Sequence, residues 1–265
     1  MRVAAPPIRP SMIRRSVGAP PMPGPDLLLF EGLSNQPYGY AHARFESVHQ
    51  DLGVPAGLWR SVGNSFNAFF HECWMDEIAA AAGGDPLEMR LRLMQGEDFA
   101  TARRVLERVA RMSGWGAAEA GRAKGLAFTL SFGTWVAQVV EVSARDGGVR
   151  VEKVWCAADL GRVLDPAIVE SQMVSGIVFG LSAAMMQAIT FEDGEAQELN
   201  FDAYDALRLR SVPEVEVALM ETAPNMGGAG EPSTPPSIPA LGNAIFALPG
   251  RRLREAPFGR AVDFV

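Results

Sequence analysis

Three features of the sequence predict a mixed α/β (α+β) fold. The chain has 265 residues, of which 48% are apolar, so it can bury a sizeable core in one large domain or two small ones. Apolar residues recur with a helical period over residues 64–114, and strand-like alternation dominates from about residue 125. Helix-start signals then return between strands up to about residue 250. The sequence contains no internal repeat, so we expect helices packed on a sheet.

Residues 1–30 are predicted to form a proline-rich extended arm, and residues 31–265 the folded part. Proline lacks a backbone donor, so this opening segment is unsuited to form a unit of its own. It contains the pair Arg14-Arg15, but no apolar stretch follows, as an export signal would require. We therefore expect a cytoplasmic location, or a periplasmic one if a partner carries the signal.

Three helices are expected in the helical part, residues 64–114. The first ends at the glycine pair 83–84. Asp85 has the character of an N-cap for the second helix, with proline next and Glu88 three residues after the cap. The third helix is expected to end at Gly114.

The part from about residue 125 to 250 combines strands and helices. Strands are expected at 125–132, 136–144 and 149–158, the last two joined as a hairpin at the Asp-Gly-Gly turn 146–148. A tight turn is expected at 191–197 and a further strand at 215–221. The last helix is expected at 235–248.

A long helix is predicted over residues 165–189, with Asp165 as its N-cap. It is apolar nearly all round, so we expect it in the interior. Gly176 and Gly180 should each weaken it by roughly 1 kcal/mol, unless something must approach that face closely. Its longest apolar run has about 14 residues, too few for the roughly 20 that a membrane-spanning helix needs.

Composition and missing motifs exclude several classes of function. The formal net charge of −7 argues against nucleic acid as the main partner. Two cysteines exclude a disulfide scaffold and a four-cysteine metal site, and the three histidines are badly spaced for a metal cage. The sequence has no dinucleotide-binding glycine fingerprint, no P-loop, no zinc-protease motif and no nucleophile elbow.

What remains is a set of four glycine-punctuated loops: WRSVGNS at 59–65, SFGTWVAQ at 131–138, ESQMVSG at 170–176 and GGAGEP at 227–232. Backbone N–H groups in such loops can cradle an anion, and glycine permits close approach. Each loop alone is typical of an ordinary turn. The last loop, however, places one carboxylate, Glu231, between glycines and a proline immediately before a helix.

In this order and spacing, the four loops resemble the C-terminal half of the molybdenum-binding subunit of the xanthine dehydrogenase/aldehyde oxidase family. The resemblance is strongest to the bacterial group that includes isoquinoline 1-oxidoreductase β subunits and related aldehyde dehydrogenases. It extends through WRSVGNSFNAFFHECWMDEIA, ADLGRVLDPAIVESQMVSGIVFGLSAA and GEPSTPPSIPALGNAIFA. It implies the C-terminal portion only of the molybdenum-cofactor-binding domain of that family, because the upstream half with its glycine-rich loop is not in this chain.

The resemblance also implies roles for particular residues. Glu231 corresponds to the general base beside the molybdenum, and no residue ligates the metal directly. The residues expected along the pterin cofactor are Gln172, Gly133, Thr134, Trp135, Val136 and Gly230. Those expected on the substrate side are Arg60, Val62 and Gly63. Trp135 could equally be a core residue.

The implied cofactor is molybdenum–molybdopterin in the cytosine dinucleotide form. The implied reaction is oxidation of an aldehyde or N-heteroaromatic small molecule with water as the oxygen source. The implied partners are the N-terminal half of the molybdenum subunit as a separate chain and a small [2Fe-2S] subunit, without which this chain should be inactive. Two alternatives stay open: a non-catalytic or truncated assembly piece of such a complex, and an unrelated α/β binding domain.

Overall fold

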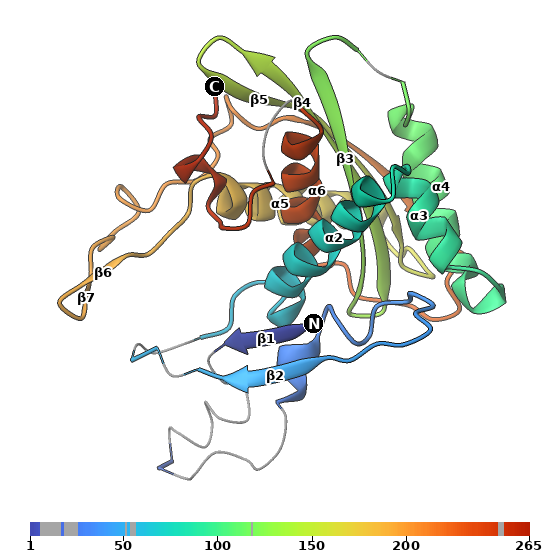
Figure 1. Ribbon diagram of the computed structural model, residues 1–265, viewed down its shortest axis with the longest axis horizontal. Coiled ribbons are helices and arrows are strands. Elements are labelled where there is room, and N and C mark those ends of the chain that lie inside the picture. The colour runs from blue at the N-terminus through green and yellow to red at the C-terminus, as the bar shows by residue number, and fades with distance from the viewer. Residues whose placement is uncertain (6–16, 19–25, 51, 54–56, 118, 249–251) are drawn as a thin grey trace.

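The computed structural model describes the chain except for residues 6–16, 19–25, 51, 54–56, 118 and 249–251. At its centre is a four-stranded sheet in the order β3-β4-β5-β8 (Figure 1). The strands are β3 (Arg122–Ser131), β4 (Thr134–Arg145), β5 (Gly148–Asp159) and β8 (Glu214–Met220). The first three form an antiparallel meander, and β8 lies parallel to β5 at the edge.

Helices cover both faces of this sheet (Figure 1). On one face, α6 (Thr234–Ala247) packs on β3 and β4 and contacts both α2 (Gly63–Ala81) and α5 (Pro166–Met185). On the other face lies α4 (Ala100–Ser113), preceded by α3 (Pro86–Leu93) and the short η2 (Glu97–Phe99). Alternate residues of β4 enter the two cores: Val136 and Val140 face α6, whereas Ala137 and Val139 face α4.

Most of the predicted elements are confirmed. The carboxylate of Asp85 accepts hydrogen bonds from the N–H groups of Leu87 and Glu88, as an N-cap should. Gly114 ends α4 in the left-handed conformation. The hairpin between β4 and β5 closes at Arg145 and Gly148. The turn expected at 191–197 is a small hairpin of β6 (Phe191–Glu192) and β7 (Glu195–Ala196).

The expectation that the long helix lies wholly in the interior is wrong. One side of α5 is buried, but Ile168 is 61% exposed and Phe179 37% exposed on the other. By length and composition, α5 is also the one helix in the described part of the chain that could span a membrane, which corrects the expectation that no run is long enough. Half of its apolar window is nevertheless buried within the protein, a property that core helices share.

The close approach anticipated at the two glycines of α5 is present, and its partner is another helix. A Cβ added to Gly176 would lie 2.1 Å from Ser233 Oγ, and one added to Gly180 would lie 2.8 Å from the carbonyl oxygen of Thr234. Real side chains do not fit at such distances. The glycines therefore allow α5 to pack against the start of α6, directly after Glu231.

Near the N-terminus, short strands and a 3-10 helix contact the rest of the domain. Strand β1 (Arg2–Ala5) pairs in parallel with β2 (Glu46–His49), and η1 (Leu27–Phe30) places Leu29 in the core. Most of the proline-rich arm predicted over residues 1–30 lies outside the described residues, so that boundary stays a prediction. The C-terminal segment includes the single turn η3 (Phe258–Arg260), whose Phe258 is fully buried.

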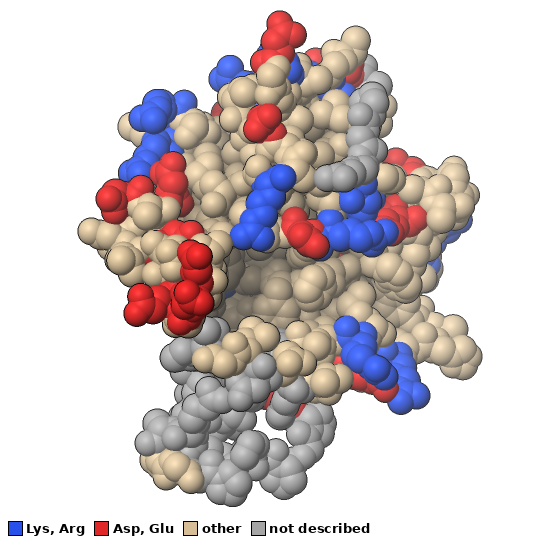
Figure 2. All heavy atoms as spheres, turned by 60° about the vertical axis from the view of Figure 1, so that its left-hand side comes forward, with Lys and Arg blue, Asp and Glu red and all other residues tan. Residues whose placement is uncertain are grey.

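A segment between α5 and β8 projects from the body and carries the β6–β7 hairpin (left of Figure 1). We call residues 189–209 the hairpin arm. Five of its large apolar side chains are between 45% and 96% exposed. They are Ile189, Phe191, Leu199, Phe201 and Leu209. Figure 2 shows that acidic side chains gather on the side of the molecule from which this hairpin projects.

Candidate active site

Three segments that are distant in the sequence meet at the guanidinium of Arg60: the turn before α2, the helix α5 and the loop before α6. The segment 170–176, expected as a loop, lies within α5, so that expectation is wrong. Its Nε and Nη2 donate to the carbonyl oxygen of Gly230, the former over 2.9 Å. Its Nη1 donates to Ser175 Oγ over 3.1 Å, and its Nη2 lies 3.5 Å from Gln172 Oε1. Arg60 thus fastens the start of α2 to α5 and to the loop before α6, as a forked donor can.

The residue after Arg60 holds Glu231. The N–H of Ser61 donates to Glu231 Oε1 over 2.9 Å, and its hydroxyl donates to the Glu231 carbonyl oxygen over 2.7 Å. The same carbonyl accepts from the N–H of Thr234, in the first turn of α6, over 3.0 Å. Glu231 is half-buried. Its carboxylate is therefore held on a fixed loop while part of it still reaches solvent.

The backbone that makes these contacts is in an unusual conformation. Ser61 and Val62 have φ values of 70° and 48°, in the left-handed region that side chains other than glycine rarely adopt. Each such residue costs on the order of 1–3 kcal/mol and persists only where its surroundings fix it. Here the contacts with Gly230 and Glu231 supply that constraint, and the strain lies directly at the candidate site.

A second carboxylate, Glu31, lies close to the first. Its Oε2 is 3.5 Å from Asn64 Nδ2, in the first turn of α2. Burial, followed by the negative charges of Glu231 and Asp26, raises the pKa of Glu31. Nothing in the sequence pattern singled out Glu31, because it precedes a glycine in a segment with no recognisable motif.

Both ends of the segment 131–138 contact the chain around Glu231. At its far end, Gln138 Nε2 donates to the Ser233 carbonyl oxygen over 2.7 Å. Gly133 has a φ of 76° in the turn between β3 and β4, and it contacts Gly227. Thr134 Oγ1 donates to the Gly228 carbonyl oxygen over 2.6 Å, and the Gly228 N–H donates to the carbonyl of Phe132 over 2.8 Å. This turn therefore supports the loop that leads to Glu231.

Trp135 and Val136 point away from that loop, into the two cores. The Trp135 ring lies 6.4 Å from the ring of Phe128, between centroids, on the α4 side of the sheet. Val136 is fully buried on the α6 side. The side chains of both residues therefore pack in the protein interior, and only their backbone belongs to the strand that follows the site.

The two remaining predicted substrate-side residues, Val62 and Gly63, lie at the start of α2. A Cβ on Gly63 would lie 2.2 Å from the carbonyl oxygen of Leu28, so Gly63 allows η1 to pack against the start of α2. Val62 is the N-cap of α2 and does not cap it through its side chain. By contrast, Gly230 and Gln172 are exposed where the loops meet.

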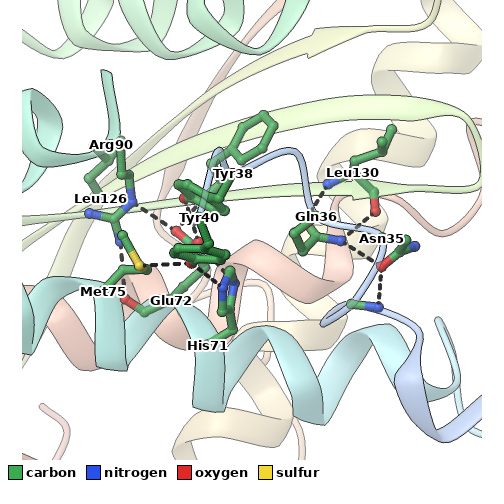
Figure 3. A network of polar contacts seen from close by, with 12 residues as sticks. Asn35, Gln36, Tyr38, Tyr40, His71, Glu72, Met75, Arg90, Leu126 and Leu130 are labelled. Carbon is green, nitrogen blue, oxygen red and sulfur yellow. Dashed lines mark hydrogen bonds and ion pairs between the residues drawn. The ribbon is translucent and has the colours of Figure 1, made fainter. Parts of the chain in front are cut away.

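A buried polar network behind the site fixes the orientation of α2 (Figure 3). Glu72 Oε2 accepts from Arg90 Nε and from the N–H of Phe128, each over 2.9 Å, and Glu72 Oε1 accepts from the hydroxyl of Tyr38 over 2.7 Å. Glu72 and Arg90 are both fully buried. Burial lowers the pKa of His71, which favours its neutral form beside the hydroxyl of Tyr40. Because α2, α3 and β3 share this ion pair, the start of α2 has a defined position.

The exposed polar groups where the loops meet α5 are compatible with a pterin cofactor. They offer the exposed amide of Gln172 and the exposed backbone at Gly133 and Gly230, which are uncharged donors and acceptors of the kind that a pterin ring pairs with. In the described part of the chain, no three His, Cys, Asp or Glu side chains come together as a metal site. A metal here would therefore be carried by ligands that belong to the cofactor.

Comparison with known proteins identifies the family of the chain. Residues 70–213, more than half of the chain, match the family described as molybdopterin cofactor-binding domain. The chain is 36% identical over 225 residues to the beta subunit of isoquinoline 1-oxidoreductase from Brevundimonas diminuta, a match that covers 83% of this chain and 29% of that protein. It is 30% identical over 241 residues to a nicotinate dehydrogenase subunit from Pseudomonas putida, a match that covers 83% of this chain and 20% of that protein.

Solved structures share the fold. The aldehyde oxidoreductase from Desulfovibrio desulfuricans superposes with a TM-score of 0.67 at 16% identity, over 88% of this chain and 44% of that one. Quinoline 2-oxidoreductase from Pseudomonas putida gives 0.64 at 14% identity, over 73% of this chain and 50% of that one. The chain spans less than a third of the length of the curated relatives described above. The match over residues 70–213 and the shared fold show that the chain belongs to the molybdopterin cofactor-binding domain family.

Proposed function

We propose that this chain is the C-terminal part of the molybdenum subunit of a hydroxylase that oxidises an aldehyde or N-heteroaromatic compound, with water as the oxygen source. The observation that carries the proposal is the placement of Glu231. Its carboxylate stands on a loop that is bonded to Arg60 and Ser61, and the residue is half-buried. The names of the two relatives given above support a substrate of this class.

In this proposal, residues of this chain bind the cofactor and accept the proton. When bound, molybdenum–molybdopterin, in our proposal the cytosine dinucleotide form, supplies the two-electron acceptor and activates water for attack. Glu231 accepts the proton that the water-derived oxygen loses, as a general base within a rigid loop. Gln172 and the backbone at Gly133, Thr134 and Gly230 would hold the pterin. Arg60 keeps these loops together.

We further propose that the active enzyme contains chain beyond this one: the rest of the molybdenum subunit and a small [2Fe-2S] subunit that takes the electrons. This chain's two cysteines are both buried and cannot hold such a cluster. The exposed apolar side chains of the hairpin arm support a further protein contact, because monomeric proteins rarely expose such groups together. The same surface would serve a non-catalytic assembly piece, so activity must be tested directly.

The test is Glu231→Gln in the assembled enzyme. The amide preserves shape but cannot accept the proton, so we expect turnover to fall by roughly 10² to 10⁴. Molybdenum content and thermal unfolding should stay near wild type, because the bond from Ser61 can still form. Glu195→Gln, on the exposed strand β7, is the control. Retention of more than about a tenth of wild-type turnover would reject Glu231 as the base, and an assembled wild-type complex without molybdenum would favour the non-catalytic alternative.

A further inference from the structure

We infer that Ser61 is the positioning residue for Glu231, holding both its backbone and one carboxylate oxygen so that the other oxygen is left to accept the proton. The inference deepens the proposed function and rests on it. It differs from the sequence expectation, which placed Arg60 and Val62 on the substrate side but gave no role to Ser61, the residue between them.

The contact is double and reaches both ends of Glu231. The Ser61 N–H is 2.9 Å from Oε1, and the Ser61 hydroxyl is 2.7 Å from the Glu231 carbonyl oxygen. One residue thus restrains the main chain and the side chain of another that is 170 positions away. Loss of the N–H bond would leave the carboxylate attached to the loop by its own rotatable bonds alone. A base that must meet a reacting atom within about 3 Å gains from such restraint.

The two carboxylate oxygens are not equivalent in this arrangement. Oε1 has a backbone donor, whereas no described residue donates a hydrogen bond to Oε2. Because the Ser61 N–H already occupies Oε1, Oε2 is the oxygen whose lone pairs are left to accept the proton.

The charges around Glu231 come from each element that packs against it. Arg60, on the same loop as Ser61, is attracted to Glu231, and Glu31, after η1, repels it. The start of α2 adds the positive end of a helix dipole. These groups act at longer range than the Ser61 N–H, which is in direct contact with the carboxylate.

The conformation of Ser61 offers a way to separate positioning from stability. Its φ of 70° is strained for serine but ordinary for glycine. Ser61→Gly therefore removes the hydroxyl bond to the Glu231 carbonyl while relieving backbone strain. Ser113→Ala is the control, because the buried Ser113 hydroxyl donates to the carbonyl of Ala110 within α4, on the other face of the sheet from Glu231.

The experiment has one measurement on the full chain and one on the assembled enzyme. In the ¹³C-glutamate-labelled chain, the δ-carboxyl signal that Glu231→Gln deletes is compared between variants near neutral pH. In Ser61→Gly we expect this signal to change position and to broaden, because the main chain of Glu231 loses the hydroxyl bond that restrains it. In the assembled enzyme we expect kcat to fall about tenfold (~1.4 kcal/mol) with KM within about twofold.

Ser113→Ala should leave the Glu231 carboxyl signal and kcat unchanged. An unchanged Glu231 signal in Ser61→Gly, or an equal change in Ser113→Ala, would overturn the positioning role. Failure of the proposed function gives a different result. If Glu231→Gln keeps full turnover while Ser61→Gly still changes the carboxyl signal, Ser61 positions a carboxylate that is not the base.

Discussion

At the scale of single residues, the candidate site combines three unfavourable features: like charges close together, partial burial of carboxylates and a strained backbone. Ser61 and Val62 adopt left-handed conformations so that Ser61 can reach Glu231 with two donors. Glu31 is a second carboxylate beside the first, and burial, followed by the charge of Glu231, raises its pKa. A protein under selection for stability alone would not place two carboxylates and two strained residues together.

The raised pKa of Glu31 gives a prediction about stability and pH. A carboxyl whose folded pKa exceeds its unfolded value binds more protons when folded, so it lowers stability as pH rises through that interval. Glu31→Gln should therefore raise the unfolding temperature at pH 7–8 and change it little near pH 4. Unfolding followed by circular dichroism at both values checks this. Glu88→Gln, an exposed change in α3, is the control. A larger gain at pH 4 than at pH 8 would contradict the burial and repulsion assigned to Glu31.

At the scale of elements, the site depends on how closely three helices pack. Helix α5 approaches the start of α6 across Gly176 and Gly180, and Ser233 Oγ donates to the Met173 carbonyl over 2.9 Å at the same junction. Helix α2 is held from behind by the buried pair of Glu72 and Arg90. An intact buried ion pair adds little net stability, but removing one partner leaves an unpaired buried charge. The pair therefore mainly fixes the direction of α2.

A change at Gly176 should test the helix junction. A methyl group there meets Ser233 Oγ, so Gly176→Ala should lower the free energy of unfolding by roughly 1–3 kcal/mol. Gly176→Leu should be worse and should reduce the molybdenum content of the assembled enzyme. Gln172→Ala should reduce it less, since only hydrogen bonds are lost, and Glu195→Leu should have no effect. Urea unfolding and metal-to-protein ratios of the four variants provide the measurements.

Full molybdenum occupancy in these variants would show that the cofactor lies away from the junction of α5 and α6. If Gly176→Leu and Gln172→Ala both kept full molybdenum occupancy, α5 would be a core helix with no part in holding the group. Such a result would leave the packing between α5 and α6 intact as an observation but would remove its link to the site.

At the scale of the whole molecule, the chain carries surface that suits a larger assembly. It spans less than a third of its named relatives, and its hairpin arm presents five large apolar side chains among acidic ones. The outward side of α5 adds Ile168 and Phe179, the latter beneath the guanidinium of Arg60 at 5.5 Å from the ring centroid. Phe179 thus connects the exposed side of α5 with the candidate site.

The hairpin arm provides the prediction at this scale. Changing Leu199, Phe201 and Leu209 to serine should increase the concentration at which the chain alone stays monodisperse, because apolar surface is removed. The same variant should lose affinity for the remainder of the molybdenum subunit by at least about tenfold. Light scattering and co-purification measure the two effects. Leu27→Ser is the control, because it changes an exposed leucine in η1, which is distant in sequence from the hairpin arm. Unaltered assembly would show that the hairpin arm serves no contact.

The sequence by itself determined the elements and the identity of the proposed base. Capping at Asp85, the left-handed Gly114 and the hairpin after Arg145 follow from local chemistry, which acts within a few residues and so is legible in one stretch of sequence. The family resemblance selected Glu231, Gln172 and Arg60, and the structure brings these three together.

The tertiary structure alone decided which neighbours act on them. Ser61, Ser175 and Glu31 join the site through contacts across more than a hundred residues, and no local pattern encodes such partners. It also turned Trp135 and Val136 into the cores, because adjacent residues of a strand face opposite sides of the sheet. One side of α5 stays exposed for a similar reason. Apolar composition measures the tendency of a helix to be buried, but only the packing of α6 against one face determines which side is covered.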